Sequence, residues 1–197
     1  MEYMIDKIKI IKNYRDAAAS VILHTDDSAI LKVVQALLYA RDNNHMVFAF
    51  GNGGSGAMAS LFIGELVKSL SYKNEKKFKA MCLNDNIPSL LAFANDVSYE
   101  DIFVEPLKNF VKPFDIVIGI SGSGNSKNVI KALEYANNIG ATTIALSGFD
   151  GGVMKKIANI NLHASIDDME IVQDAHMFLL HCIKRVLTFS IKGETSL

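Results

Sequence analysis

The chain has 197 residues, of which half are hydrophobic and 21% are charged, with a formal net charge of −1. This length suits a single domain with a sizeable core, and the near-zero charge gives no electrostatic case for binding nucleic acid or an anionic membrane surface. No apolar run is long enough to cross a bilayer, no signal-peptide pattern opens the chain, and the two cysteines form no pattern. We therefore expect a cytoplasmic protein with free thiols.

The first 44 residues predict two amphipathic helices. Apolar residues recur at helical spacing from about residue 2 to residue 23. A second pattern begins after Asp26 or Ser28, either of which could cap it, and ends near Asn43. Two helices before any strand are more than one sheet needs. They either make contacts between subunits or cover an edge of the sheet, and the sequence leaves both explanations open.

From residue 45 onward the chain alternates between strand and helix patterns. Strands are expected over 46–50, 78–83, 114–119 and 142–146 and near residue 160. Helices are expected over 57–70, 126–138 and 169–191, with short helices on either side of Asn95-Asp96 and a natural stop at Gly140. Because the strands are apolar throughout, we predict an α/β fold with a parallel sheet of about five strands, covered by helices in three αβα layers.

The stretch 120–126, Ile-Ser-Gly-Ser-Gly-Asn-Ser, joins an apolar strand to a helix. Serine hydroxyls and the free N–H groups of a helix N-terminus bind phosphate, and glycines let the backbone approach the anion. The alternative is a loop that only turns the chain, but three serines within six residues exceed what a turn requires. The candidate phosphate ligands are Ser121, Gly122, Ser123 and Ser126.

A second loop, Gly51-Asn52-Gly53-Gly54-Ser55-Gly56, follows the first predicted strand. Its glycines have the spacing of a dinucleotide fingerprint, but the acidic residue expected about twenty residues later is poorly matched. The serine loop likewise lacks the Gly-Lys-Ser/Thr of a P-loop. Two such loops at the carboxyl edge of one sheet suit a polyhydroxy phosphate better, with backbone N–H groups and the Asn52 amide available to its hydroxyls.

Together the two loops resemble the sugar isomerase (SIS) domain family and, within it, the bacterial phosphoheptose isomerases. The likeness covers nearly the whole chain in the same order, through Asn95-Asp96, residues 146–152, Gln173, His176 and His181. The resemblance implies one SIS domain over residues 1–197, with N-terminal helices over 1–44 and a flavodoxin-like phosphosugar-binding core over 45–197.

The resemblance also implies an activity, which is the conversion of sedoheptulose 7-phosphate into D-glycero-D-manno-heptose 7-phosphate for lipopolysaccharide or capsule. It implies a homotetramer with active sites between subunits and a sugar phosphate as the small-molecule partner. Glu65 would be the base and His181 the partner acid, because aldose–ketose exchange moves a proton between neighbouring carbons through an enediol. The implied substrate contacts are Asn52, Gly53, Gly54, Ser55, Asn95, Asp96 and Gln173, beside the phosphate ligands of the serine loop.

Glu65 also stands out by its position after an apolar, small-residue helical stretch. If it is buried there, its pKa should be raised, as suits a base; the alternative is a solvated glutamate on the outer face. His181 lies in a very apolar helical stretch, where a core or interface histidine is the more common meaning. We interpret His176 as structural or as supporting the site.

Zinc is where the sequence departs from the family. Many phosphoheptose isomerases bind zinc through a histidine one turn before the glutamate, that glutamate, a glutamine and a histidine. The last three correspond to Glu65, Gln173 and His181, but the first is Leu61, which has no donor atom, and Ser69 replaces a common arginine. Three ligands and a water could still bind zinc, yet Gln173 and His181 lie two turns apart, about 12 Å of helical rise. We predict weak or absent zinc and no other cofactor.

These losses keep a second class of function open. Some SIS proteins bind phosphosugars or protein partners without catalysis, and this chain could be such a binding protein or tetrameric scaffold. Retention of Glu65, Gln173 and His181 together favours the enzyme, since a scaffold has no need of that trio. A related phosphosugar isomerase is a further alternative, because the sequence sets neither the length nor the stereochemistry of the sugar.

Overall fold

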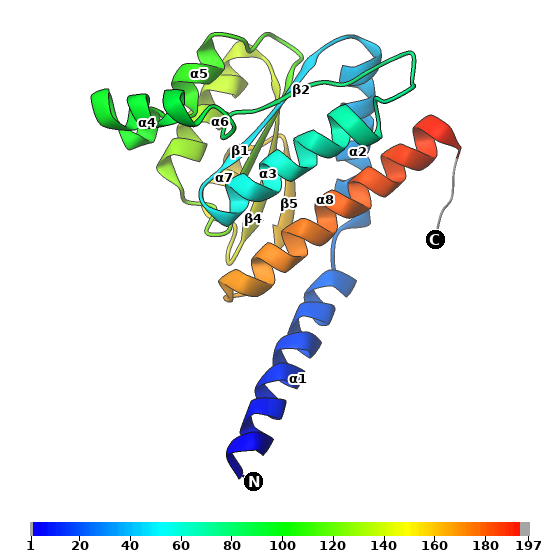
Figure 1. Ribbon diagram of the computed structural model, residues 1–197, viewed down its shortest axis with the longest axis vertical. Coiled ribbons are helices and arrows are strands. Elements are labelled where there is room, and N and C mark those ends of the chain that lie inside the picture. Colours follow the sequence, from blue (N-terminus) through cyan, green and yellow to red (C-terminus); the bar gives the residue numbers. More distant parts are fainter. Residues whose placement is uncertain (1, 194–197) are drawn as a thin grey trace.

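The structure is a computed structural model that describes residues 2–193, with side chains from residue 6 onward. A parallel sheet forms the middle layer, with strands in the order β2-β1-β3-β4-β5 (Figure 1). Its strands are β1 (Met46–Gly51), β2 (Lys79–Cys82), β3 (Ile116–Ser121), β4 (Thr142–Gly148) and β5 (Ile160–Ala164). This is the flavodoxin-like strand order, and the predicted five-stranded α/β fold is confirmed.

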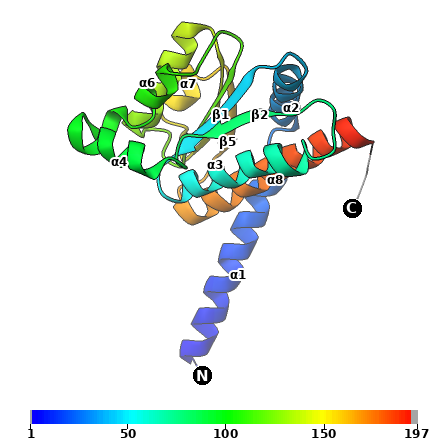
Figure 2. The same ribbon diagram turned by 45° about the horizontal axis from the view of Figure 1, so that its top comes forward.

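Helices cover both faces of the sheet (Figure 2). One face carries α2 (Asp27–Asp42), α3 (Gly54–Gly64) and α8 (Met169–Lys192), and α3 runs on into a π-helical turn, Glu65–Ser69. The other face carries α4 (Ile87–Asp96), a 3-10 turn at Tyr99–Asp101, α5 (Val104–Lys108), α6 (Lys127–Ile139) and α7 (Met154–Ile157). None of the helices in this described part of the chain is both long and apolar enough to cross a membrane.

The strands are apolar throughout because alternate residues enter two different cores. In β1, Val47 and Ala49 pack under α2, α3 and α8, whereas Phe48 and Phe50 pack under α5 and α6. Successive side chains of a strand point to opposite faces, so a strand covered on both sides has no solvated position. The continuous apolar runs of the sequence therefore predict this sheet correctly.

Local signals set several helix ends. The Asp26 carboxylate caps α2 by accepting the N–H groups of Ser28 and Ala29, which decides between the two predicted caps. Gly140 ends α6 in the left-handed conformation (φ 85°), as predicted. Two expectations are wrong in detail. Helix α3 begins at Gly54 rather than near residue 57, and Asn95-Asp96 form the last turn of α4 instead of separating two helices.

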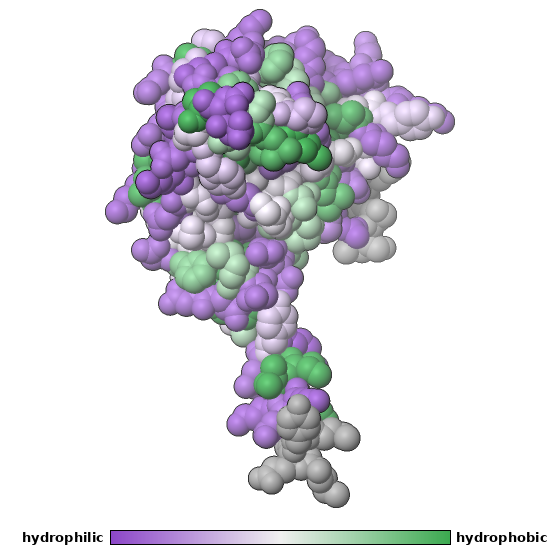
Figure 3. Space-filling view, turned by 60° about the vertical axis from the view of Figure 1, so that its left-hand side comes forward, coloured by the Kyte–Doolittle hydropathy of each residue, from purple (hydrophilic) through white to green (hydrophobic). Residues whose placement is uncertain are grey.

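The first two helices take different roles. Helix α2 packs on the sheet, in contact with β1, β3 and β5. Helix α1 (Glu2–Leu23) contacts α8 instead, with the Tyr14 hydroxyl donating to Asp174 Oδ2 at 2.6 Å, and its N-terminal half projects from the body (Figures 1 and 2). That half carries exposed Ile8, Ile10 and Ile11, and Figure 3 shows an apolar patch on the projecting helix. Within the described residues this apolar surface is uncovered.

Candidate active site

The serine loop lies where β3 ends and α6 begins. Ser121 is the last residue of β3, and its Oγ lies 2.9 Å from Ser126 Oγ, at the N-cap of α6, and 3.4 Å from Ser123 Oγ. Gly124 has a φ of +65°, and a Cβ there would overlap the carbonyl oxygen of Gly151, so only glycine fits this turn. Three hydroxyls thus converge at a helix N-terminus, an arrangement that suits a phosphate group.

The glycine loop meets the serine loop from the neighbouring strand β1. The Asn52 amide forms a reciprocal pair with that of buried Asn128 on α6 (3.0 and 2.8 Å), and its Oδ1 also accepts the Tyr99 hydroxyl at 3.0 Å. The Asn84 side chain holds Gly51 through two hydrogen bonds: its Oδ1 accepts the Gly51 N–H at 3.2 Å, and its Nδ2 donates to the Gly51 carbonyl at 2.8 Å. Asn52 therefore links the glycine loop to the start of α6 through Asn128 and to the 3-10 turn through Tyr99, two residues that the sequence analysis did not identify.

The remaining predicted substrate contacts lie in two places. Gly53 caps α3 at a φ of 52°, and Gly54 and Ser55 form its first turn. Gln173 of α8 reaches this turn, since a Cβ on Gly54 would stand 2.8 Å from its Oε1. Asn95 and Asp96 are exposed at the end of α4, where Asn95 Nδ2 donates to Asp96 Oδ1 at 2.7 Å.

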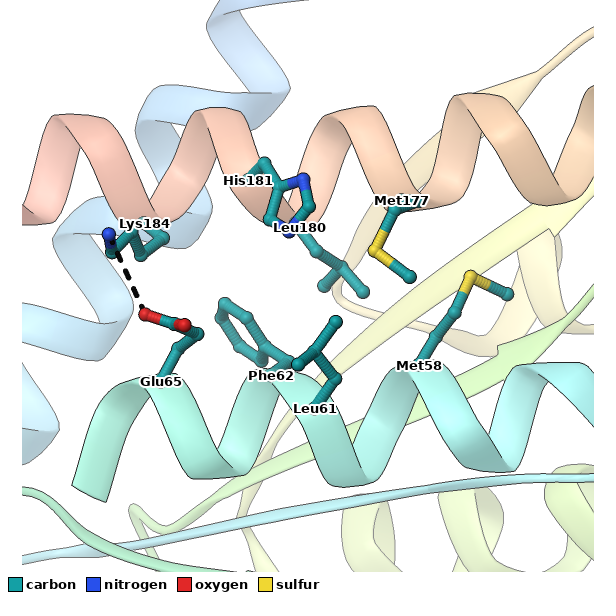
Figure 4. Close-up of a pocket in the computed structure, with 8 residues that line it drawn as sticks. All are labelled: Met58, Leu61, Phe62, Glu65, Met177, Leu180, His181 and Lys184. Carbon is teal, nitrogen blue, oxygen red and sulfur yellow. Dashed lines mark ion pairs between the residues drawn. The ribbon is translucent and has the colours of Figure 1, made fainter. Parts of the chain in front are cut away.

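A narrow groove between α3 and α8, too narrow in this chain to hold a water molecule, is lined by the candidate acid and base (Figure 4). The two helices run side by side from the carboxyl edge of the sheet, so Glu65, just beyond α3, faces α8 at Lys184. Lys184 Nζ lies 3.6 Å from Glu65 Oε2, and the two side chains are 33% and 30% exposed. His181 is exposed one turn before Lys184, so it is a wall residue rather than a core histidine. The groove is lined by Met58, Leu61, Phe62, Glu65, Met177, Leu180, His181 and Lys184.

The electrostatics of Glu65 correct the expectation of a raised pKa. The Ser69 side chain, followed by the Lys184 ammonium, holds the pKa of the Glu65 carboxyl below its usual range, against the upward effect of partial burial. Glu65 Oε2 is nevertheless buried and accepts no hydrogen bond. The carboxylate is therefore ionised, and its buried oxygen lies 3.6 Å from the Lys184 ammonium.

His176 lies between α8 and the end of β4. It is fully buried, its Nε2 lies 3.1 Å from the Ser147 carbonyl oxygen, and its Nδ1 has no partner. Burial lowers the pKa of His176 to about 4. This histidine is neutral at physiological pH and anchors α8 to the sheet.

The residues around Glu65 do not fit a zinc ion. Leu61 contributes only carbon to the groove, and the Lys184 ammonium faces the carboxylate that would have to bind the metal. A dication bound to Glu65 would be repelled by this ammonium, whose Nζ lies 3.6 Å from the carboxylate. Gln173 lies beside Gly54, at the start of α3, whereas Glu65 lies just beyond its end. The donor set of this chain is therefore not that of a zinc centre.

Comparison with known proteins places this architecture among sugar isomerases. The sequence profile of the SIS domain family matches residues 13–148. A probable phosphoheptose isomerase of Thermoplasma acidophilum is 37% identical over 172 residues, covering 87% of this chain and 94% of the relative. The phosphoheptose isomerase of Helicobacter pylori strain 26695 is 38% identical over 162 residues, covering 80% and 83%.

Solved structures agree with this placement. A phosphoheptose isomerase from Francisella tularensis superposes with a TM-score of 0.85 at 25% identity, covering 93% of this chain and 97% of the other. The phosphoheptose isomerase of Neisseria gonorrhoeae has the same fold, with a TM-score of 0.80 at 24% identity and coverage of 94% and 97%.

Proposed function

The chain belongs to the SIS domain family, and from this premise we propose that it is a phosphoheptose isomerase. It interconverts sedoheptulose 7-phosphate and D-glycero-D-manno-heptose 7-phosphate through an enediol. Two features of the same chain carry this proposal. Three serines converge at the carboxyl edge of the sheet, and a carboxylate and a histidine line the groove between α3 and α8. Relatives named phosphoheptose isomerase at 37% and 38% identity support the choice of substrate.

The serine loop holds the phosphate in this proposal. Hydroxyls of Ser121, Ser123 and Ser126 donate to its oxygens, and the N-terminus of α6 adds partial positive charge. The glycine loop and Gln173 contact the sugar hydroxyls. Binding energy from this remote group orients the reacting carbons, so it contributes to catalysis as well as to affinity.

Glu65 and His181 carry out the proton transfers. Glu65 removes a proton from C1, next to the ketose carbonyl, and returns it to C2. His181 moves the hydroxyl proton from O1 to O2, which converts one enediolate into the other. The lowered pKa keeps Glu65 ionised, so that its carboxylate can receive the proton.

In this proposal two copies of the chain complete the site. Glu65 lies ten residues beyond Ser55 along α3, a helical rise of about 15 Å away from the phosphate cradle. A seven-carbon sugar phosphate spans roughly 10 Å at covalent bond lengths near 1.5 Å. This separation favours a site in which the phosphate cradle and Glu65 come from different chains. We infer that the cradle of one subunit works with Glu65 of another, within a homotetramer.

The projecting half of α1 supplies a surface for such contacts. Ile8, Ile10 and Ile11 are 48%, 67% and 65% exposed in the single chain. Burying apolar side chains of this size against another subunit is favourable. Of the two roles left open for the N-terminal helices, contact between subunits is the one that suits α1.

The cellular setting follows from the proposed substrate. The product would feed heptose into lipopolysaccharide or capsule, and the sugar phosphate would be converted in the cytoplasm. Cys82 and Cys182 are free thiols, as suits a reducing compartment.

A time course in deuterated water tests this function. We expect purified protein to convert sedoheptulose 7-phosphate and to incorporate deuterium, as followed by NMR. Glu65→Gln keeps the shape but removes the base, so turnover should fall roughly 100- to 10,000-fold while sugar-phosphate binding remains. Glu75→Gln, at an exposed position in the loop before β2, is the matched control and should match the wild type.

The same experiment separates the second candidate function. A noncatalytic phosphosugar-binding protein is favoured by Leu61 and Ser69, which stand where many members of the family have a histidine and an arginine. Wild-type protein that binds the sugar phosphate yet exchanges no proton, with or without added zinc, would establish that role and refute the isomerase.

A further inference from the structure

Lys184 is the cation that pairs with the candidate base in the groove. It follows His181 by three residues on α8, so both side chains lie on the same wall (Figure 4). Its Nζ lies 3.6 Å from Glu65 Oε2. The candidate acid, the candidate base and a positive charge thus line one groove between two helices.

The ion pair between Lys184 and Glu65 contributes little to the stability of the fold. Both side chains are about one-third exposed, at 33% and 30%, and pairs this exposed add little stability. Helices α3 and α8 are already joined by apolar contacts through buried Met58, Phe62 and Leu180. Glu65 Oε2, the oxygen nearest Lys184, is buried without a hydrogen bond. A buried acceptor left without a donor lowers stability, which points to a role in binding or chemistry rather than in folding.

We propose that Lys184 is a catalytic residue and that its ammonium supplies the positive charge of this site, so that the enzyme works without a bound divalent metal. The assignment rests on the proposed isomerase function. It also accounts for Leu61, because a site that carries its own cation beside Glu65 has no need of a further metal ligand on α3.

The chemistry gives the ammonium an anionic partner throughout the reaction. When the C1 proton moves to Glu65, the C–H electron pair becomes the C1=C2 bond and the carbonyl π pair moves onto O2. Negative charge leaves the carboxylate and appears on the enediolate oxygen, while the total charge stays the same. Lys184 faces the first anion in the resting enzyme and the second after the proton transfer, and a preorganised charge of this kind stabilises the transition state.

Removing the charge while keeping the bulk of the side chain is the decisive test. In Lys184→Met we expect kcat to fall about 100-fold or more, with KM within about threefold of the wild type. Lys184→Arg should recover most of the loss, since it restores the cation. The matched control is Lys76→Met, which breaks another exposed ion pair, to Asp42 at 3.2 Å, far from the groove. Urea unfolding of all three variants should give midpoints close to the wild type.

Metal dependence is measured on the same samples. We expect wild-type turnover to survive dialysis against EDTA, and the dialysed enzyme to contain no stoichiometric zinc by elemental analysis. The proposal is overturned if EDTA abolishes turnover and zinc restores it, or if Lys184→Met keeps the wild-type kcat. Wild-type protein that exchanges no substrate proton under any metal condition overturns the isomerase function itself, and this assignment with it.

Discussion

Replacing His176 with glutamine should make the stability of the protein less sensitive to acid. The Ser147 carbonyl can only accept, so His176 Nε2 carries the hydrogen of the neutral ring, and Nδ1 is buried with no partner. Protonation would add an N–H to Nδ1 with nothing to accept it, in an apolar site. A glutamine amide can still donate to the Ser147 carbonyl, but it does not titrate.

The magnitude follows from the shift in pKa. Burial lowers the pKa of His176 to about 4 in the native state, whereas an unfolded histidine titrates near 6.5. As the pH falls below 6.5 the unfolded chain binds a proton that the native state refuses, so stability is lost between about pH 6.5 and pH 4. Linkage gives a loss of about 2 kcal/mol at pH 5 relative to pH 7.5, and about 3 kcal/mol by pH 4.

Urea unfolding at fixed protein concentration measures this loss. Wild type and His176→Gln are compared at steps from pH 7.5 to pH 5.0, and the difference between their slopes isolates His176 from other titrating groups. His24→Gln, at an exposed position after α1, serves as the control and should keep the wild-type slope. If His176→Gln loses stability with falling pH as steeply as the wild type, the buried neutral histidine is not the cause and the reasoning fails.

Two further outcomes follow from the phosphate cradle and from α1. Ser121→Ala removes the hydroxyl that meets Ser126 Oγ at 2.9 Å; it should raise KM for the sugar phosphate roughly 10- to 100-fold, as for a hydrogen bond to a charged group. Ser190→Ala changes an exposed serine near the end of α8 and is the control, for which KM should stay at the wild-type value. If Ser121→Ala also leaves KM unchanged, the serine loop does not bind the phosphate. Ile8→Glu combined with Ile11→Glu should lower both the molar mass in light scattering and the activity, because the exposed apolar face of α1 would carry charge. Lys12→Glu should leave the mass unchanged, and a double variant that keeps the wild-type mass contradicts the role given to α1.

The fold could be predicted because its signals are local. Val47 and Phe48 are adjacent in the sequence yet enter opposite cores, so a strand buried on both faces reads as an unbroken apolar run. Gly140 ends α6 because glycine adopts the left-handed conformation without strain. The start of α3 was misplaced because it depends on a loop contact, the Ser55 N–H donating to the Asn52 carbonyl at 3.0 Å, which glycine propensity does not reveal.

The sequence by itself determined the fold class, the position of the serine loop and the presence of a carboxylate and a histidine in two of the predicted helices. The direction of the Glu65 pKa shift and the identity of the cation beside it were decided only by the tertiary structure. The reason is the separation along the chain between the residues that interact. Turns and strand faces are set by residues a few positions apart, whereas the charge environment of Glu65 depends on Lys184, which packing of α3 against α8 brings within 3.6 Å.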